Sequence, residues 1–149
     1  MNEDPTVLLV EDDPDDVLLT RRAFAKAHFP VPLHVVSDGQ GAIDYLGGAG
    51  EYADRARFPL PLVLLLDLKL PRLSGFEVLQ WLRGQPGLRR IPVVVLTGSG
   101  QSVDINRAYD LGANSYLVKP VRSDDLADLV KSLNLYWLLL NEKPDPRAP

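Results

Sequence analysis

The sequence predicts an α/β fold built on an open, doubly wound parallel sheet of five strands. Five short apolar runs recur along the chain, and a stretch with helical spacing follows each of them. The runs are mostly continuous rather than alternating, which is typical of strands covered on both faces of a parallel sheet. Five repeats of strand and helix favour right-handed crossovers. The predicted strands are 6–10, 33–36, 62–66, 93–97 and 115–119.

Apolar residues three or four positions apart predict the helix after each strand. The fourth helix, in SVDINRAYDLGA, has the weakest pattern, and Gly112 favours its end there. The fifth has the clearest stripe and is expected over 124–140. The pattern consists of Val17, Thr20, Phe24 and Ala27 in the first helix, Ile43 and Leu46 in the second, Val78 and Leu82 in the third, and Leu126, Leu129, Val130, Leu133 and Trp137 in the fifth.

Composition limits the classes of protein to which the chain can belong. Its 149 residues, 46% hydrophobic and 24% charged, fit one globular domain. The net charge of −4 argues against a broad nucleic-acid surface. The absence of cysteine excludes disulfides and suits a reducing cytosol. Since neither a signal peptide nor a membrane-spanning run is visible, we expect a cytoplasmic protein that binds neither membranes nor nucleic acid.

A single domain is expected over 6–140, and two segments depart from its strand–helix pattern. Residues 47–61 are rich in glycine, proline and charge, and we interpret them as an enlarged loop. Residues 141–149 form a polar, proline-rich tail that is expected to fray. No separate output domain is expected.

Polar residues follow the predicted strands, at the sheet edge where doubly wound folds bind ligands. Carboxylates that converge there need a positive partner, either a lysine or a hard cation with oxygen ligands such as Mg²⁺. With no cysteine and only two histidines, a zinc site is not expected. The strand-end residues are Glu11, Asp12, Asp67, Thr97, Gly98, Lys119 and Pro120.

Asp67 stands in the segment LLLDLKLPRLSG, directly after a buried-looking strand. From the residues alone it is a metal ligand, a phosphoryl acceptor or an ordinary strand-end acid. Pro71 is expected to stiffen the loop that follows, and Ser74 to cap the next helix.

The last two strand ends carry their own signals. Gly98 and Gly100 let the loop after Thr97 approach a ligand closely. Peptide bonds before proline are where cis bonds occur, and a cis Lys119–Pro120 bond is predicted to turn the lysine back over the sheet edge.

The acidic segment VEDDPDD divides into two groups. Glu11 and Asp12 are interpreted as the acids of the sheet edge. Asp13 precedes a proline and is expected to be the helix N-cap. Asp15 and Asp16 fall in the first helical turn, where negative charge complements the helix dipole. On this interpretation only the first pair contributes to the site.

The motifs VEDD, DLKLPRLSG, VVVLTGSG and NSYLVKP occur in this order along the chain. Together they resemble the receiver domain of bacterial two-component response regulators, which has a flavodoxin-like fold, and the resemblance covers 6–140. The spacing agrees as well, since Asp67 lies 30 residues before Thr97 and 52 before Lys119. Pro71 and Gly75 fall at the family's loop positions.

The resemblance implies that Asp67 accepts a phosphoryl group from a histidine kinase, with Mg²⁺ as cofactor. Asp12, Asp67 and the backbone carbonyl of Lys69 would bind Mg²⁺, and Glu11 would do so through a water molecule. Lys119 would contact the phosphoryl oxygens.

The resemblance also implies a switch. Thr97 would hydrogen-bond the phosphoryl group, and Tyr116 would turn inward as Thr97 moves. The protein would be a signalling phosphoprotein and not an enzyme, apart from any catalysis of its own phosphorylation and dephosphorylation.

A narrower resemblance concerns the small single-domain regulators that partner phytochrome-type histidine kinases. It rests on the 47–61 loop, HVVSDGQGAIDYL, RRIPVVVLTGSG and the aromatic YW near the C-terminus. The signal would leave by protein contact or phosphorelay.

Residues 135–140 carry more apolar surface than one helix face needs. This favours a homodimer through the fourth and fifth helices and the C-terminal end over a strongly buried terminal helix. The candidate dimer residues are Leu135, Tyr136, Trp137 and Leu139.

Three competing functions belong to other classes. A degenerate receiver that only binds partners would lack some of the acids or the lysine, yet all are present. A phosphatase with an aspartyl nucleophile usually carries a second acid where this chain has Lys69. A flavodoxin-like cofactor binder needs a loop that cradles phosphate after the first strand, where residues 11–16 would repel it.

Overall fold

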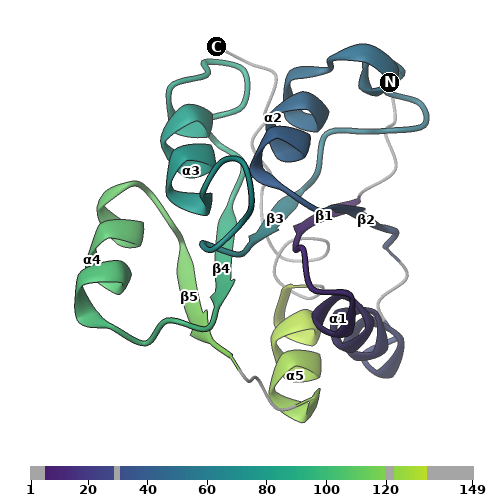
Figure 1. Ribbon diagram of the computed structural model, residues 1–149. Helices are drawn as coiled ribbons and strands as arrows, with labels where there is room; N and C mark the ends of the chain where they lie inside the picture. Colours follow the sequence, from purple (N-terminus) through teal and green to yellow (C-terminus); the bar gives the residue numbers. More distant parts are fainter. Residues whose placement is uncertain (1–5, 29–30, 120–122, 134–149) are drawn as a thin grey trace.

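Five parallel strands form one sheet in the order β2-β1-β3-β4-β5 (Figure 1). A computed structural model describes residues 6–28, 31–119 and 123–133. The predicted doubly wound α/β fold is confirmed, and every strand lies within one residue of its predicted bounds. The strands are β1 (Val7–Val10), β2 (Leu33–Val36), β3 (Val63–Leu66), β4 (Val93–Thr97) and β5 (Ser115–Val118).

Helices cover both faces of the sheet (Figure 1). α1 and α5 pack together on one face, while α2, α3 and α4 lie along the other. Within the described ranges, no helix has both the length and the apolar character needed to cross a membrane. Residues 134–140 of the predicted fifth helix lie outside those ranges. The helices are α1 (Pro14–Lys26), α2 (Gly39–Gly47), α3 (Gly75–Arg83), α4 (Ser102–Asp110) and α5 (Ser123–Leu133).

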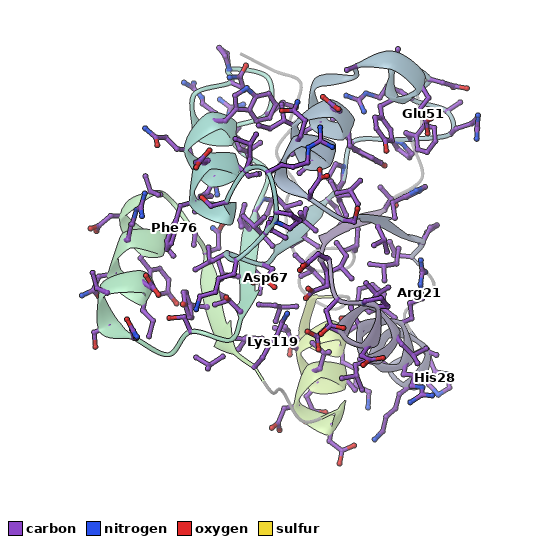
Figure 2. All side chains as sticks on the ribbon, in the orientation of Figure 1. Arg21, His28, Glu51, Asp67, Phe76 and Lys119 are labelled. Carbon is purple, nitrogen blue, oxygen red and sulfur yellow. The ribbon has the colours of Figure 1, made fainter. Side chains whose placement is uncertain are left out.

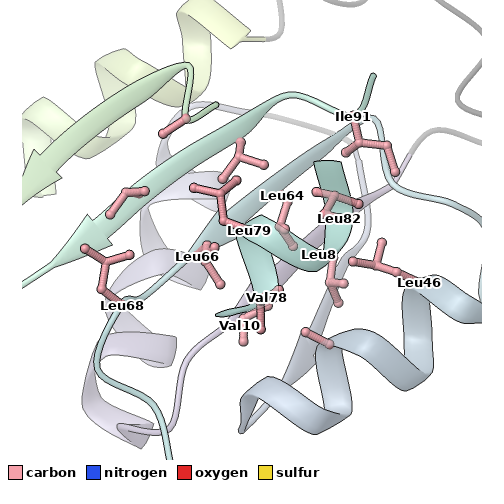
Figure 3. Packing of buried hydrophobic residues seen from close by; sticks show 14 of the residues in the cluster. Leu8, Val10, Leu46, Leu64, Leu66, Leu68, Val78, Leu79, Leu82 and Ile91 are labelled. Atoms are coloured by element: carbon pink, nitrogen blue, oxygen red, sulfur yellow. The ribbon is translucent and has the colours of Figure 1, made fainter. Parts of the chain in front are cut away.

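Successive strand residues alternate between two buried clusters, one under each helical layer. In β1, Leu8 and Val10 pack beneath α2 and α3, whereas Val7 and Leu9 pack with α1 and α5. Figure 3 shows the first cluster, where side chains of β1, β3, α2 and α3 gather. Because strand side chains point alternately to opposite faces, a strand buried on both faces is apolar at every position. This explains the continuous apolar runs in the sequence.

Two predicted N-caps are confirmed. Asp13 Oδ1 accepts a hydrogen bond from Asp15 N at 2.9 Å at the start of α1. Ser74 Oγ accepts one from Glu77 N at 3.2 Å at the start of α3. Each cap satisfies an N–H group that has no partner within the helix and contributes about 1 kcal/mol. The caps therefore start both helices a few residues after the strand ends that carry the acids.

The 47–61 segment, which was predicted as an enlarged loop, contains a short 3₁₀ helix and an aromatic cluster. The 3₁₀ helix is Gly50–Ala53. The rings of Tyr52 and Phe58 meet edge to face, with their centroids 4.9 Å apart, and both contact the ring of Tyr45 in α2. Such aromatic pairs stabilise a fold beyond their buried area alone. The segment is thereby anchored on α2.

Candidate functional site

Three ionisable residues follow β1, β3 and β5 and meet at one edge of the sheet. The backbone N–H groups of Glu11, Asp67 and Lys119 donate to carbonyl groups of β2, β1 and β4 at 3.0, 3.1 and 2.7 Å, respectively. These bonds extend the strand ladder and fix each backbone as it leaves the core. Figure 2 shows Asp67 and Lys119 at the same end of the sheet. The predicted convergence of strand ends is therefore present.

Carboxylates surround the ammonium group of Lys119. Its Nζ donates to Asp67 at 3.0 Å and to Asp16 at 2.9 Å, and it also contacts Glu11. The side chains of Glu11 and Asp67 are only 3% and 9% exposed, and that of Lys119 is 19% exposed. Removing one member of such a buried pair costs about 3–5 kcal/mol, because a charge is left without a partner. Lys119 is thus the cation that holds the acids together.

The sequence interpretation left Asp16 outside the site, and this was wrong. Its carboxylate lies against Lys119. Thr20, four residues later, is buried, and residues four apart in a helix lie on the same face. Asp16 therefore belongs to the inward face of α1 as well as to its first turn. The helical spacing from Thr20 is the sequence signal that would have revealed this.

Glu11, Asp12 and Asp67 form a cluster of oxygen donors that fits a hard divalent cation. One carboxylate oxygen from each lies within 4.8 Å of the others. Glu11 and Asp67 are buried, whereas Asp12 is exposed, so the cluster reaches the surface. Lys69, whose carbonyl was predicted as a ligand, lies in the adjoining loop, and its N–H donates to Asp67 Oδ1 at 3.2 Å. Mg²⁺ prefers one or two carboxylates together with carbonyls and waters.

The electrostatics of the cluster favour a second cation beside Lys119. Burial raises the pKa of Glu11 to about 7, and contact with Lys119 only partly opposes this rise. Burial would lower the pKa of Lys119, but its hydrogen bonds to three carboxylates raise it above the ordinary value. The lysine therefore stays charged at neutral pH while the acids outnumber it. A divalent cation would supply the missing positive charge.

The hydroxyl of Thr97 is buried and has no hydrogen-bond partner. Among the residues that the structure describes, it is the only buried side-chain polar atom in this condition. An unpaired buried hydroxyl costs about 1–3 kcal/mol, so Thr97 has a hydrogen-bonding capacity that a bound group could use. The next residue, Gly98, is exposed, and a Cβ there would meet no atom within 4 Å. Space for a ligand therefore adjoins the threonine.

Hydrogen bonds connect Tyr116 to the loop between β4 and α4. The Tyr116 hydroxyl donates to the carbonyl of Ser99 at 2.8 Å, and the Ser99 hydroxyl donates to Asp104 in α4. Ser99 is buried and Tyr116 is half-buried. A movement of this loop would therefore change the surroundings of the tyrosine.

The loop between β3 and α3 folds tightly against Asp67. Gly75 N donates to Leu68 O at 2.8 Å, and a Cβ at Gly75 would lie 2.2 Å from the Asp67 carbonyl oxygen. Only glycine permits so close an approach of two backbone segments. Pro71 is exposed in the same loop, where its carbonyl accepts a hydrogen bond from Leu73 N at 2.9 Å. The loop motif thus sets the backbone position of Asp67.

Some predicted residues lie outside the described part of the chain. Pro120 is one of them, and the cis Lys119–Pro120 bond stays a prediction. The same holds for the homodimer contacts assigned to Leu135, Tyr136, Trp137 and Leu139.

A family model described as the response regulator receiver domain matches residues 7–131. The chain belongs to the response regulator receiver family. The sequence resemblance and the flavodoxin-like fold are thereby confirmed. As a receiver, the protein is a component of two-component signalling, in which the partner is a histidine kinase.

Several relatives match this receiver over most of their own length. The probable methanogenesis regulatory protein FilR2 of Methanothrix harundinacea is 42% identical, over 97% of this receiver and 91% of FilR2. The structure of the phosphorylated cyanobacterial phytochrome response regulator RcpA has a TM-score of 0.82 and 38% identity, covering 95% and 99% of the two chains. The Mn²⁺-bound form of response regulator Rcp1, from Synechocystis, has a TM-score of 0.79 and 36% identity, covering 94% and 99%. This receiver is thus closely related to single-domain regulators associated with phytochromes.

We expect the substitution Gly75→Ala to lower the free energy of unfolding by about 1–3 kcal/mol, because the added methyl group overlaps the backbone at Asp67. Gly98→Ala is the matched control, since space is open there, and it should change the free energy by less than about 0.5 kcal/mol. Urea denaturation measures both values. Equal stability of the two variants would contradict the tight-loop account.

Proposed function

We propose that Asp67 is the phosphoryl acceptor of this receiver. The observation that carries the proposal is its contact with Lys119, 3.0 Å away, within the same cluster as two further acids. β3 lies between β1 and β4 in the sheet. A phosphoryl group on Asp67 would therefore have the acids after β1 on one side and the unpaired hydroxyl of Thr97 on the other. Glu11 and Asp12 follow β1, which lies between β2 and β3, so neither has β4 and Thr97 at its side.

In the proposed reaction, a carboxylate oxygen of Asp67 forms a bond to the phosphorus of a phosphohistidine on the kinase. The phosphorus–nitrogen bond breaks, and its electron pair stays on the imidazole nitrogen. Phosphoryl transfer needs positioning and charge neutralisation more than covalent work from the protein. Lys119 is held where it would contact the transferred oxygens, and Thr97 has a free donor for them.

The cation that we assign to the acid cluster is Mg²⁺. Asp12, Asp67 and the carbonyl of Lys69 would be its ligands, and Glu11 would bind it through a water molecule. When bound, Mg²⁺ supplies positive charge at the phosphoryl oxygens. The Mn²⁺-bound form of Rcp1 supports this assignment, because Mn²⁺ and Mg²⁺ favour the same oxygen ligands.

The phosphoryl group would act on the rest of the domain through Thr97 and Tyr116. It brings about −1.5 to −2 charges and strong acceptor oxygens. Thr97 would donate to one of these oxygens and draw the loop after β4 toward the site, and Tyr116 would turn inward in response. The signal would then leave the 6–140 domain in the cytoplasm, by protein contact or by phosphorelay.

A binding-only receiver and an aspartyl phosphatase are the competing functions. The first has no support from the geometry, because the acids, Lys119 and the unpaired Thr97 are all in place. The second would need an acid at Lys69, whose side chain is exposed.

Acetyl phosphate, a small phosphodonor, tests the proposed acceptor. We expect intact-mass measurements to show the gain of one phosphoryl group in the presence of Mg²⁺ and almost none with EDTA. The Asp67→Asn variant should gain none, since its side chain cannot form the acyl phosphate. Asp128→Asn, which alters an exposed acid of α5, should behave like the wild type. No Mg²⁺-dependent gain by the wild type would favour the binding-only receiver.

We propose a phytochrome-type histidine kinase as the phosphoryl donor. The likeness to RcpA supports this choice, although FilR2 is named for a different process. Transfer of labelled phosphate from a purified phytochrome-type kinase should be faster than from an unrelated histidine kinase. Equal rates would contradict the assignment.

A homodimer through α4, α5 and the C-terminal end is also proposed. Three apolar residues on α4 and at the end of β5 support it, because Val103, Tyr109 and Val118 are 67%, 47% and 43% exposed. Light scattering after size exclusion should give twice the chain mass of 16.5 kDa. A single-chain mass in both the phosphorylated and the unphosphorylated protein would exclude the dimer.

A further inference from the structure

Asp16 adds an acid to the site that neither the proposed acceptor nor the proposed cation site requires. It comes from the first turn of α1, whereas Glu11 and Asp67 directly follow strands. It is absent from the cluster of possible metal ligands, which consists of Glu11, Asp12 and Asp67. Its partner in the site is Lys119 instead, at 2.9 Å. The role of Asp16 must therefore be sought in what it does to the lysine.

An ammonium group has three hydrogen-bond donors. In Lys119 they are directed to Glu11, Asp16 and Asp67. A phosphoryl group on Asp67 would present several more oxygens to the same ammonium. Asp16 then occupies one N–H group of Lys119 that could otherwise donate to a phosphoryl oxygen.

Neighbouring side chains do not force Lys119 against Asp16. A cavity of about 30 Å³, roughly the size of one water molecule, lies on the α1 and α5 side of the lysine, lined by Asp16, Thr20, Leu126 and others. The ammonium thus has room on this side and is not pressed there by neighbouring side chains. Its contact with Asp16 is therefore an electrostatic one, made alongside those with Glu11 and Asp67.

We propose that Asp16 competes with the phosphoryl group for Lys119 and thereby weakens the phosphorylated state of this receiver. Asp16 is a positioning residue, since it acts through the lysine rather than on the phosphoryl group. The inference rests on Asp67 being the phosphoryl acceptor. It predicts that the loss of Asp16 strengthens the binding of a phosphoryl group. If Asp16 only held the lysine ready, its loss would weaken the binding of a phosphoryl group instead.

Beryllofluoride, an equilibrium mimic of the phosphoryl group, tests this proposal at saturating Mg²⁺. Asp16→Asn should bind it about three- to tenfold more tightly than the wild type, because a neutral amide competes for Lys119 less strongly than a carboxylate does. Asp15→Asn is the matched control, because it removes an exposed acid from the same helical turn, and it should stay within about twofold of the wild type. Fluorine NMR or calorimetry measures these affinities.

Asp16→Glu separates charge from shape. Asparagine keeps the shape of the side chain and removes its charge, whereas glutamate keeps the charge and changes the shape. A merely structural Asp16 would tolerate Asn and be disturbed by Glu. Under the proposal, Asp16→Glu should bind beryllofluoride like the wild type. An equal gain in both Asp16 variants would overturn the proposal.

The outcomes also separate this inference from the proposed function. If the wild type binds beryllofluoride and Asp16→Asn binds it no more tightly than Asp15→Asn, only the competition by Asp16 is rejected. If the wild type binds no beryllofluoride in the presence of Mg²⁺, the acceptor role of Asp67 and the inference both fall.

Discussion

One electrostatic constraint governs this receiver: several carboxylates converge on the edge of the sheet, and one ammonium meets them. Glu11, Asp16 and Asp67 share Lys119, and the first and last of these are nearly inaccessible to solvent. A single cation cannot compensate all the acids, and burial raises the pKa of Glu11 to about 7 despite its contact with Lys119. The site is therefore disposed to take up a divalent cation, and a cation placed there would favour the arrival of an anionic phosphoryl group.

The rest of the fold keeps these repelling groups in place. Strands buried on both faces anchor the backbone up to the last apolar residue, and ladder hydrogen bonds continue just beyond it. Gly75 allows the next loop to close against Asp67, and the caps at Asp13 and Ser74 start α1 and α3 soon afterwards. Because the buried strands are parallel, the charged residues that follow them are held together at one edge of the sheet.

The sequence predicted those features that depend on local chemistry. Continuous apolar runs located the strands, because burial on both faces requires them, and the caps at Asp13 and Ser74 followed from their hydroxyl or carboxylate next to a helix start. Asp16 was misplaced because its contact with a residue 103 positions away is tertiary, although its helical register with a buried threonine was visible. The aromatic cluster of 47–61 was missed for a similar reason, since ring contacts between α2 and a loop leave no periodic pattern.

The account is tested most directly by the stability of Lys119→Met with and without Mg²⁺. In EDTA, the free energy of unfolding should fall by about 3 kcal/mol relative to the wild type, because buried carboxylates lose their partner. Added Mg²⁺ should stabilise this variant more than the wild type, since the acid cluster then has no other cation. Lys131→Met, on the exposed side of α5, should show neither effect. If Lys119→Met proved as stable as the wild type in EDTA and gained no more from Mg²⁺, the carboxylates would not depend on the lysine, and the account would be contradicted.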